Sequence, residues 1–477
     1  MYAMRSMSII MLLIFLVCAA LISCGGDDDD SDDESGAPVD DDADADDDTD
    51  DDADDDADDD TDDDADDDTD DDDADDDADD DAFDALTYVG DLPVLRLKGD
   101  AYARGYGLGE AIGGDIVFLY EEYILKYALG LSPEYCNIFE GLRNLACGVL
   151  KYTDEELRQM EGIAEGIRDH WQTEIMLSDG TVLEFNKNDI CIANALADFA
   201  QIACSSVSAW GDMTEDGETI IARNLDWGPG PDNLLGQATV VISETPADES
   251  WNFISVTFPG FIGCLSCMNG DGDAAFIHDT ARWHSEIAIA VEPRVMMARR
   301  ALLAAQGAPD DFAAFEAVIE AADVDTGNNF HFVRAAVAGD RAAACFEVDD
   351  NETHPDGFAT LRTDLDAAAS GTDLQEVFFV TNNHRKRYGD PSECWRYDSM
   401  LESVENIMNE QRSPITLDDL HETIKKVEFI DPELTVHTIL FKPSEMTLKI
   451  FRLGPDHLAS EDEGVIVPES VLFPWNQ

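Results

Sequence analysis

Two short runs of β-forming residues flank a polar turn in the middle of the chain, and together they predict a hairpin. The first run is Cys204-Ser-Ser-Val-Ser-Ala-Trp-Gly and the second is Thr219-Ile-Ile-Ala-Arg-Asn-Leu-Asp-Trp227. The turn between them contains Asp216-Gly217, a typical turn pair. An antiparallel return strand would bring Arg223 and Asp226 back beside Cys204. The sequence therefore predicts a thiol, a guanidinium and a carboxylate at one strand end, which are the parts of a nucleophilic site.

The chain begins with the features of an export signal. Arg5 precedes an apolar run over residues 9–21, which is too short to cross a bilayer comfortably. We therefore expect residues 1–23 to be a signal peptide. Leu21-Ile-Ser-Cys24 is similar to a bacterial lipobox, which implies that Cys24 is lipidated and becomes the mature N-terminus. An ordinary signal peptide with an incidental cysteine is the alternative.

The residue after Cys24 is glycine and not the aspartate that retains such lipoproteins in the inner membrane. The resemblance to the lipobox thus predicts an exported lipoprotein of the outer membrane, on its periplasmic face or at the cell surface. Its partner would be the membrane, reached through the lipid on Cys24.

An aspartate-rich tract follows from Asp27 to Asp81. It holds 39 acidic residues and no basic one, so it has nothing to bury and repels itself. We expect residues 24–82 to form a disordered acidic linker. A calcium-collecting tract is the alternative, because carboxylates are hard ligands, but the spacing of an EF-hand loop is missing.

The rest of the chain is also acidic, with 68 acidic residues against 27 basic ones once Arg5 is set aside. This excess of negative charge argues against nucleic acid as a partner.

Residues 83–477 are numerous enough for a large core or for two lobes. Alternating and apolar runs predict strands at 88–97, 238–243, 251–257, 274–278, 330–337, 343–348, 377–381, 435–441 and 447–452. Helices are expected near 153–171, where Thr153 and Glu156 form a capping box, and at 188–202, 294–306 and 311–321. This order predicts a layered α+β fold with two sheets between helices.

Two local motifs resemble functional sites. The glycines of Gly99-Asp-Ala-Tyr-Ala-Arg-Gly-Tyr-Gly-Leu-Gly109 match neither a dinucleotide fingerprint nor a Walker loop, so we expect a helix packed close to a sheet. Cys264-Leu-Ser-Cys267 has redox or half-zinc spacing, but no second pair accompanies it, which favours a structural role. Eight cysteines remain after Cys18 and Cys24, and in an exported protein they can form disulfides whose pairing the sequence does not give.

An ordered set of segments from about Leu95 to Leu453 resembles the C45-type N-terminal-nucleophile (Ntn) hydrolases. These are relatives of isopenicillin N acyltransferase and are more distantly similar to acid ceramidase and to the bile-salt (choloylglycine) hydrolases. The matching segments are Gly99 to Gly109, Cys204-Ser-Ser, Ala222-Arg-Asn-Leu-Asp-Trp227, Phe258-Pro-Gly-Phe-Ile-Gly263, Met268-Asn-Gly-Asp-Gly272, Thr381-Asn382, Arg396-Tyr397 and Thr435-Val-His-Thr438. The resemblance implies a four-layer αββα sandwich, preceded here by the disordered acidic linker.

The resemblance also implies self-cleavage between Ala203 and Cys204. Residues 83–203 would then be the N-terminal (α) part and residues 204–477 the catalytic (β) part. The new α-amine of Cys204 has an intrinsic pKa of about 8, close to the thiol's value of roughly 8.5, so it can accept the thiol proton without a histidine. We expect no metal or organic cofactor.

The remaining roles follow from the same resemblance. Asp226 would orient the amine, and Arg223 would bind the carbonyl side of the substrate or lower the thiol pKa. Asn382 would donate to the oxyanion, although the adjacent Asn383 is an open alternative. Arg396 would line the same pocket, and Asn224 would be a supporting residue. Because the turn between Cys204 and Arg223 is longer than in the compared relatives, a one-residue slip would point Arg223 the wrong way.

The expected activity is that of a self-processing cysteine amidohydrolase or acyltransferase acting on N-acyl amides through an acyl-Cys204 intermediate. Hydrolysis is favoured over acyl transfer, because acyl-CoA is not expected outside the cytoplasm. The α and β parts would stay associated after cleavage, with a disulfide as one possible link. The alternative is a surface-anchored binding lipoprotein that keeps the fold without turnover. A papain-like site is disfavoured, because its signature around the cysteine is missing.

Overall fold

The computed structural model describes residues 85–199, 203–283, 292–322, 326–335, 340–351, 353–389, 393–410, 414–430 and 432–473. The expected signal peptide, the lipidated Cys24 and the acidic linker lie outside these residues. No helix in this described part is long and apolar enough to cross a membrane.

Two large sheets form the centre of the fold. The first sheet has nine strands in the order β1-β2-β7-β8-β9-β10-β11-β12-β13. Its strands are β1 (Leu86–Val89), β2 (Leu92–Lys98), β7 (Val240–Thr245), β8 (Phe253–Thr257), β9 (Ser266–Asn269), β10 (Ala274–Trp283), β11 (Thr326–Val333), β12 (Ala343–Val348) and β13 (Ala359–Arg362).

The second sheet has six strands in the order β14-β5-β6-β15-β16-β17. These are β14 (Val377–Val380), β5 (Ala203–Ala209), β6 (Ile220–Asp226), β15 (Thr435–Lys442), β16 (Thr447–Arg452) and β17 (Val465–Val467). A separate ribbon pairs β3 (Glu174–Met176) with β4 (Val182–Glu184).

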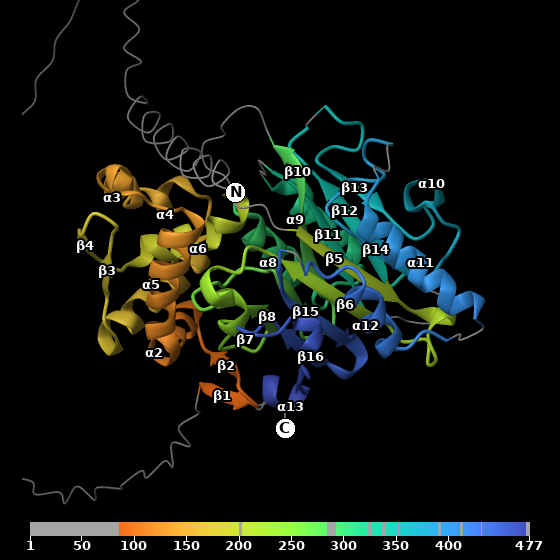
Figure 1. Cartoon of the computed structure of the whole chain (residues 1–477), viewed down its shortest axis with the longest axis horizontal. Helices are drawn as coiled ribbons and strands as arrows, with labels where there is room; N and C mark the ends of the chain where they lie inside the picture. Colours follow the sequence, from red (N-terminus) through yellow and green to blue (C-terminus); the bar gives the residue numbers. More distant parts are fainter. Residues whose placement is uncertain are drawn as a thin grey trace, which may run out of the picture. The chain divides into compact units, whose positions relative to one another are not determined.

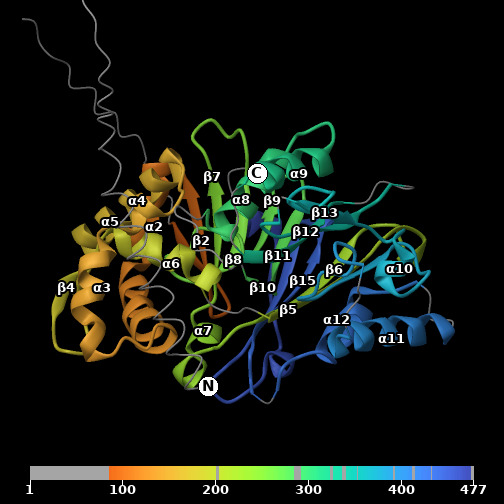
Figure 2. The ribbon, with the colours of Figure 1, turned by 90° about the horizontal axis from the view of Figure 1, so that it is seen from above.

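Helices lie on both outer sides of the paired sheets (Figures 1 and 2). The helices packed against the nine-stranded sheet are α2 (Ala101–Leu119), α5 (Asp154–His170), α6 (Lys187–Phe199), α8 (Arg294–Ala305) and α9 (Asp311–Ala321). On the far side, α11 (Trp395–Asn409) and α12 (Leu417–Lys425) cover the six-stranded sheet. The shorter helices are α3 (Cys136–Arg143), α4 (Ala146–Val149), α7 (Leu234–Gln237), α10 (Ala367–Ser370) and α13 (Glu469–Leu472), and a π-helix, η1 (Tyr120–Ala128), extends α2.

Three clusters of buried apolar side chains hold the helices and the two sheets together. One joins the helices around α2 and α8 to the nine-stranded sheet, and another joins α11 and α12 to the six-stranded sheet. The third contains side chains of both sheets, such as Phe276 and Ile439, and therefore fills the space between them. The predicted mixture of helices and sheets is thus confirmed.

The predicted central hairpin is present with the predicted register. β5 and β6 are antiparallel, with Ala203 opposite Asp226 and Ser206 opposite Arg223. Paired residues share a face, so Arg223 lies on the same face of the sheet as the Cys204 side chain. The longer turn therefore does not cause a slip, because the register is set by the pairing of the two strands.

Several expected elements differ from the structure. The single strand predicted at 88–97 is two strands, β1 and β2, joined by a turn in which Gly90 has a positive φ of 64°. The helix expected at 188–202 is described as Lys187–Phe199, and β11 begins earlier than predicted and ends at Val333. Trp171 caps α5 in an extended conformation instead of continuing its apolar face.

The glycine-rich run does form a helix, but its closest neighbour is another helix and not a sheet. α2 and α5 cross with their backbones almost in contact. A Cβ atom at Gly105 would lie 2.0 Å from the carbonyl oxygen of Gln159, and one at Gly162 would lie 2.2 Å from that of Tyr102. Only residues without a side chain allow this approach.

Replacing Gly105 or Gly162 by alanine should therefore destabilise the protein by about 3 kcal/mol, because the two helix backbones must separate. Chemical denaturation of each variant measures this loss. Gly141→Ala is the matched control: Gly141 lies in α3, and a Cβ atom added there would have no neighbour within 4 Å, so the change should stabilise the helix by about 0.5–1 kcal/mol. Equal effects at Gly105 and Gly141 would contradict the tight crossing.

Candidate active site

Cys204 is the second residue of β5 and is fully buried. Its backbone, as well as its thiol, is held by the side chains of predicted site residues. The backbone N–H donates to Oδ1 of Asn382 at 2.8 Å, and the backbone carbonyl accepts from Nη1 of Arg396 at 2.7 Å. The guanidinium of Arg223 donates to the Cys204 sulfur at 3.3 Å.

The six-stranded sheet explains how distant residues reach Cys204. β14 pairs with β5 antiparallel, with Val380 opposite Ser206, so the residues after β14 arrive at the start of β5. Asn382 is in this segment. Arg396 extends from the first turn of α11, which covers the same end of the sheet.

Asn382 and Arg396 contact each other as well as Cys204. Arg396 donates through Nη2 to Oδ1 of Asn382 at 2.6 Å, and the Nδ2 group of Asn382 donates to the carbonyl of Asp279. The neighbouring Asn383 is placed differently, because its backbone carbonyl accepts from Asn329. Of the two asparagines left open by the sequence, the structure brings Asn382 to the backbone of Cys204.

Asp226 lies at the end of β6, on the opposite face of the sheet from Arg223. Its carboxylate accepts from Nη1 of Arg396 at 3.2 Å and from the hydroxyl of Thr435 at 2.6 Å. Thr435 stands opposite Asp226 in the pairing of β15 with β6. Sequence reasoning gave Thr435 no role of its own, although it lies in one of the family-like segments.

Asn224 lies against α12 and does not contact the thiol. Its amide donates to the carbonyl of Ile424 at 3.1 Å, and its carbonyl accepts from the hydroxyl of Thr438 at 2.7 Å. It therefore fixes α12 against β6 and β15, and its predicted role as a supporting residue of the site stays a prediction.

Burial has the largest effect on the pKa values of Cys204 and Asp226. It raises the pKa of the Cys204 thiol to about 11, although the positive charge of Arg223 acts in the opposite direction. Arg223 by itself lowers the thiol pKa, as expected. The loss of hydration on burial raises this pKa by more, so the net shift is upward. Burial likewise raises the pKa of Asp226 to about 6, against the opposing charge of Arg396.

An apolar cavity lies next to this strand end. It is lined by Leu119, Tyr123, Ile124, Ala193, Leu196, Trp227, Leu235, Phe258, Pro259 and Phe261. Trp227 directly follows Asp226, so the cavity adjoins the carboxylate end of the site. At about 20 Å³ it has room for little more than one water molecule. Trp251 does not line this cavity and stacks on Arg104 instead.

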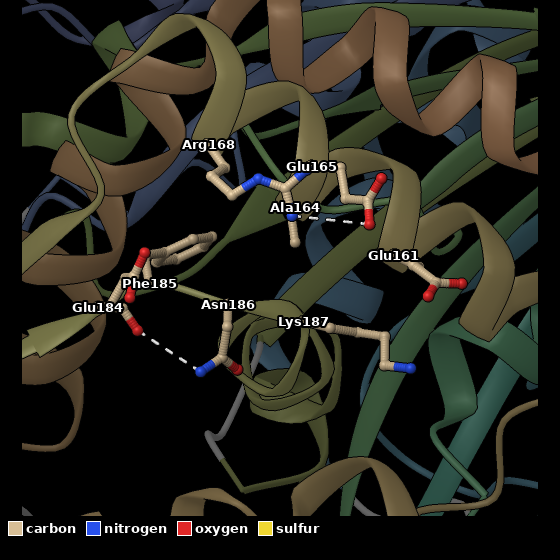
Figure 3. A pocket seen from close by; sticks show the side chains of 8 residues that line it. All are labelled: Glu161, Ala164, Glu165, Arg168, Glu184, Phe185, Asn186 and Lys187. Atoms are coloured by element: carbon tan, nitrogen blue, oxygen red, sulfur yellow. Dashed lines mark hydrogen bonds and ion pairs between the residues drawn. The ribbon is translucent and has the colours of Figure 1, made fainter.

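A larger hollow of about 290 Å³ lies between α5 and the segment that joins β4 to α6 (Figure 3). Charged side chains line most of it. Arg168 lies against Glu165, and the amide of Asn186 donates to the carbonyl of Glu184. None of the predicted site residues lines this hollow.

Within the described residues there are two disulfides, Cys147–Cys191 and Cys264–Cys267. The second pair joins the two cysteines of the Cys-x-x-Cys motif, and both are buried. In the described part of the chain, no group of His, Cys, Asp and Glu has the arrangement of a metal site.

No family model matches the chain. An uncharacterized protein of Archaeoglobus fulgidus is 27% identical over 208 residues, which are 40% of this chain and 34% of that protein. The chain thus spans about a third of the length of this relative.

Among solved structures, a Caenorhabditis elegans ortholog of N-acylethanolamine-hydrolyzing acid amidase is 13% identical, with a TM-score of 0.34 over 50% of this chain and 93% of that chain. Two variants of the conjugated bile acid hydrolase from Clostridium perfringens are 10% and 8% identical, each with a TM-score of 0.33. They cover 56% and 55% of this chain, and 97% and 96% of their own. Scores of this size leave the function to be argued from the residues of this chain.

Proposed function

We propose that the protein is a self-processing cysteine amidohydrolase of the N-terminal-nucleophile kind, which hydrolyses N-acyl amides through an acyl-Cys204 intermediate. The observation that carries this proposal is that side chains form hydrogen bonds with both backbone groups of Cys204. Its nitrogen lies against Asn382 and its carbonyl against Arg396, and both partners come from other parts of the chain. A buried backbone N–H needs an acceptor in any site, but here the acceptor is a side chain predicted for the same site, and an N-terminal nucleophile would use this nitrogen as its base.

The thiol needs a base, because with its pKa raised to about 11 it is protonated at neutral pH. In the described part of the chain no histidine or carboxylate forms a hydrogen bond with its sulfur, which instead accepts from Arg223. Cleavage of the Ala203–Cys204 bond would place an α-amine on the same residue, with an intrinsic pKa of about 8.

The proposed reaction then proceeds in two steps. The amine takes the thiol proton, the sulfur attacks the amide carbonyl, and the C–N bond breaks as the amine passes this proton to the leaving group. Water next attacks the thioester carbonyl, the C–S bond breaks, and the carboxylic acid leaves as a proton from the water returns to the Cys204 sulfur through the α-amine. Asn382 would stabilise the oxyanion, Arg396 would fix Asn382, and Asp226 would orient the α-amine. Acyl transfer to a second amine in place of water remains the same chemistry with another acceptor.

The apolar cavity beside Trp227 supports an apolar substituent on the substrate. Aliphatic and aromatic side chains share its wall, with Trp227 edge-on to Phe258 and Phe261. Because the cavity of the uncleaved chain is small, side chains such as Tyr123 must move before an acyl group can enter. The order of the three apolar clusters, with one between the sheets and one outside each, also supports the four-layer αββα sandwich.

The two parts of the cleaved chain should stay together without a covalent link. Both disulfides join residues on the same side of the cleavage site, so neither connects the α part to the β part. Instead β2 pairs with β7 in parallel, and Glu244 of β7 accepts from Arg104 of α2 at 3.0 Å. Asn194 adds hydrogen bonds to the backbone at Gly260 and Ile262.

We therefore expect the cleaved protein to elute as one species under native conditions and to give two bands on a denaturing gel without reductant. Omitting or adding reductant should make no difference to the two bands. A single band that splits only on reduction would contradict the assignment, because it would require a disulfide between the parts.

Protonation of Asp226 should lower hydrolysis with a midpoint near pH 6, in addition to the loss expected as the α-amine base, with its intrinsic pKa of about 8, becomes protonated. Burial raises the pKa of Asp226 to about 6, so the carboxyl gains a proton as the pH falls through that value. It then no longer carries the charge that holds Arg396 and the proposed α-ammonium. The pH dependence of kcat/KM measures this, and a flat profile between pH 5 and 7 would contradict the role of Asp226.

The experiment that tests the function is acyl-enzyme trapping. The purified protein is mixed with a panel of N-acyl amides, quenched in acid and analysed by peptide mass. A mass increase equal to the acyl group on the peptide that begins at Cys204 supports the amidohydrolase. The alternative is the surface-anchored binding lipoprotein, and it would lead if N-acyl amides bind without any adduct or release of acid.

We also propose that the protein is exported and is anchored to the outer membrane through a lipid on Cys24. Lipidation of Cys24 would leave the α part on the outer membrane, with the β part held by packing. Mass analysis of the N-terminal peptide from membranes tests this directly.

A further inference from the structure

The loop from Cys264 to Cys267 adjoins the proposed site. Its two cysteines, which are separated by Leu265 and Ser266, form a disulfide, and both are fully buried. Ser266 lies inside this loop as the first residue of β9, opposite Phe276 of β10. The loop is anchored at its start, where the N–H of Cys264 donates to the carbonyl of Val295 at 2.8 Å.

Arg223 meets this loop from the other sheet. It stands on β6 of the six-stranded sheet, and its Nη1 donates to the hydroxyl of Ser266 at 2.6 Å. Its Nη2 donates to the carbonyl of Ile277 at 3.1 Å and to the sulfur of Cys204 at 3.3 Å. In the described part of the chain no carboxylate lies within ion-pair distance of Arg223. Neutral groups therefore fix the direction of this guanidinium, and Ser266 supplies the side-chain acceptor other than the thiol itself.

We propose that Ser266, held in the loop that the Cys264–Cys267 disulfide closes, is a positioning residue that aims Arg223 at the Cys204 thiol. A long arginine side chain has several rotatable bonds, so it keeps one geometry only when its hydrogen-bond partners are themselves fixed. The disulfide fixes the backbone on both sides of Ser266. The inference rests on the proposed function only in taking Cys204 as the reacting thiol.

The charges that face the thiol are few. Arg223 and Asp226 come from β6, and Arg396 comes from α11. The positive charges of Arg223 and Arg396 favour the thiolate, whereas Asp226 disfavours it. Arg294, the first residue of α8, is also close enough to interact with Cys204. Moving the guanidinium of Arg223 away should therefore make the thiol harder to ionise.

Apart from Asp226, whose pKa of about 6 lies below the range in which the thiol titrates, the titratable groups around Arg223 in the described residues do not change charge near neutrality. They are buried histidines, His278 of β10, His331 of β11 and His437 of β15. Burial and the charge of Arg223 lower the pKa of each, to about 3 for His331 and well below the usual range for the other two. A change in the titration of Cys204 can then be assigned to the position of Arg223.

The test follows alkylation of Cys204 by iodoacetamide as a function of pH in the full chain, read by peptide mass. Ser266→Ala should shift the profile upward by about one pH unit, which slows alkylation at neutral pH about tenfold. Ser266→Thr keeps the hydroxyl and should restore the wild-type profile. An unchanged profile in Ser266→Ala, with the protein folded, would overturn the proposal.

The disulfide is tested by the double variant Cys264→Ser/Cys267→Ser. Its profile should shift in the same direction as that of Ser266→Ala, and combining the changes should add little. The matched control is Cys147→Ser/Cys191→Ser, which removes the other disulfide. It should lower the thermal midpoint without moving the profile, and an equal shift in this control would overturn the proposal.

Hydrogen exchange supplies a readout that does not need a reactive Cys204. Amides of residues 264–269 should exchange faster in the Cys264→Ser/Cys267→Ser variant than in the wild type, and unchanged exchange would overturn the bracing role of the disulfide. These measurements separate the two proposals. A chain that neither cleaves itself nor forms an acyl-enzyme, but shows the shift in Ser266→Ala, would refute the proposed function and leave this inference standing.

Discussion

Replacing Cys204 by alanine should leave a single uncleaved chain and abolish amide hydrolysis, whereas the wild type should separate into two fragments. In the proposed mechanism one residue supplies both the nucleophile and, after cleavage, the base. Its loss should therefore reduce kcat by at least about 10³-fold. Intact mass spectrometry under denaturing conditions measures the cleavage, with the second fragment expected to begin at Cys204.

Cys136→Ala is the control for this experiment. Cys136 is also a free and buried thiol, but it lies in α3, and its sulfur contacts Ser132 and Ser178 rather than any predicted site residue. Cleavage and turnover should be as in the wild type. If wild type and Cys204→Ala both remain single chains, the free α-amine is removed from the mechanism and the binding lipoprotein becomes the better explanation.

Asn382→Ala should lower kcat by about 10²–10³-fold, and Asn383→Ala should change it by no more than a few-fold. Removing one donor to an oxyanion typically costs about 3–4 kcal/mol of barrier. Asn382 is the asparagine whose side chain reaches the backbone of Cys204, at 2.8 Å, and the guanidinium of Arg396, at 2.6 Å. The contact from Asn329 to Asn383 is to a backbone carbonyl, which alanine keeps.

Steady-state kinetics of the cleaved enzymes measures this difference. Asn382→Asp adds a finer test, because it keeps an oxygen toward Cys204 and replaces the Nδ2 donor by an acceptor. If the donor matters, this variant should be as impaired as Asn382→Ala. Equal losses in the two alanine variants, at Asn382 and at Asn383, would contradict the assignment of the oxyanion donor.

Much of the fold was predictable because its signals are local. The capping box of Thr153 and Glu156 begins α5 as expected, since a cap depends on residues three apart. Strands β12 and β16 and helix α9 have the predicted bounds, because alternation and apolar periodicity are written in consecutive residues. The glycines of α2 were less informative. Their spacing indicates a close approach, but only the packing of α2 on α5 shows what approaches.

The candidate site likewise has one part that local sequence predicts and another that depends on tertiary structure. By itself the sequence determined that Cys204, Arg223 and Asp226 meet at one strand end, since two β-forming runs that flank one turn pair as antiparallel neighbours. Only the tertiary structure decided that Asn382 and Arg396 join them, because those contacts bridge 178 and 192 residues and depend on how β14 and α11 meet β5. It also decided that the thiol is buried and protonated, since hydration is lost only when the sheets and helices close around it.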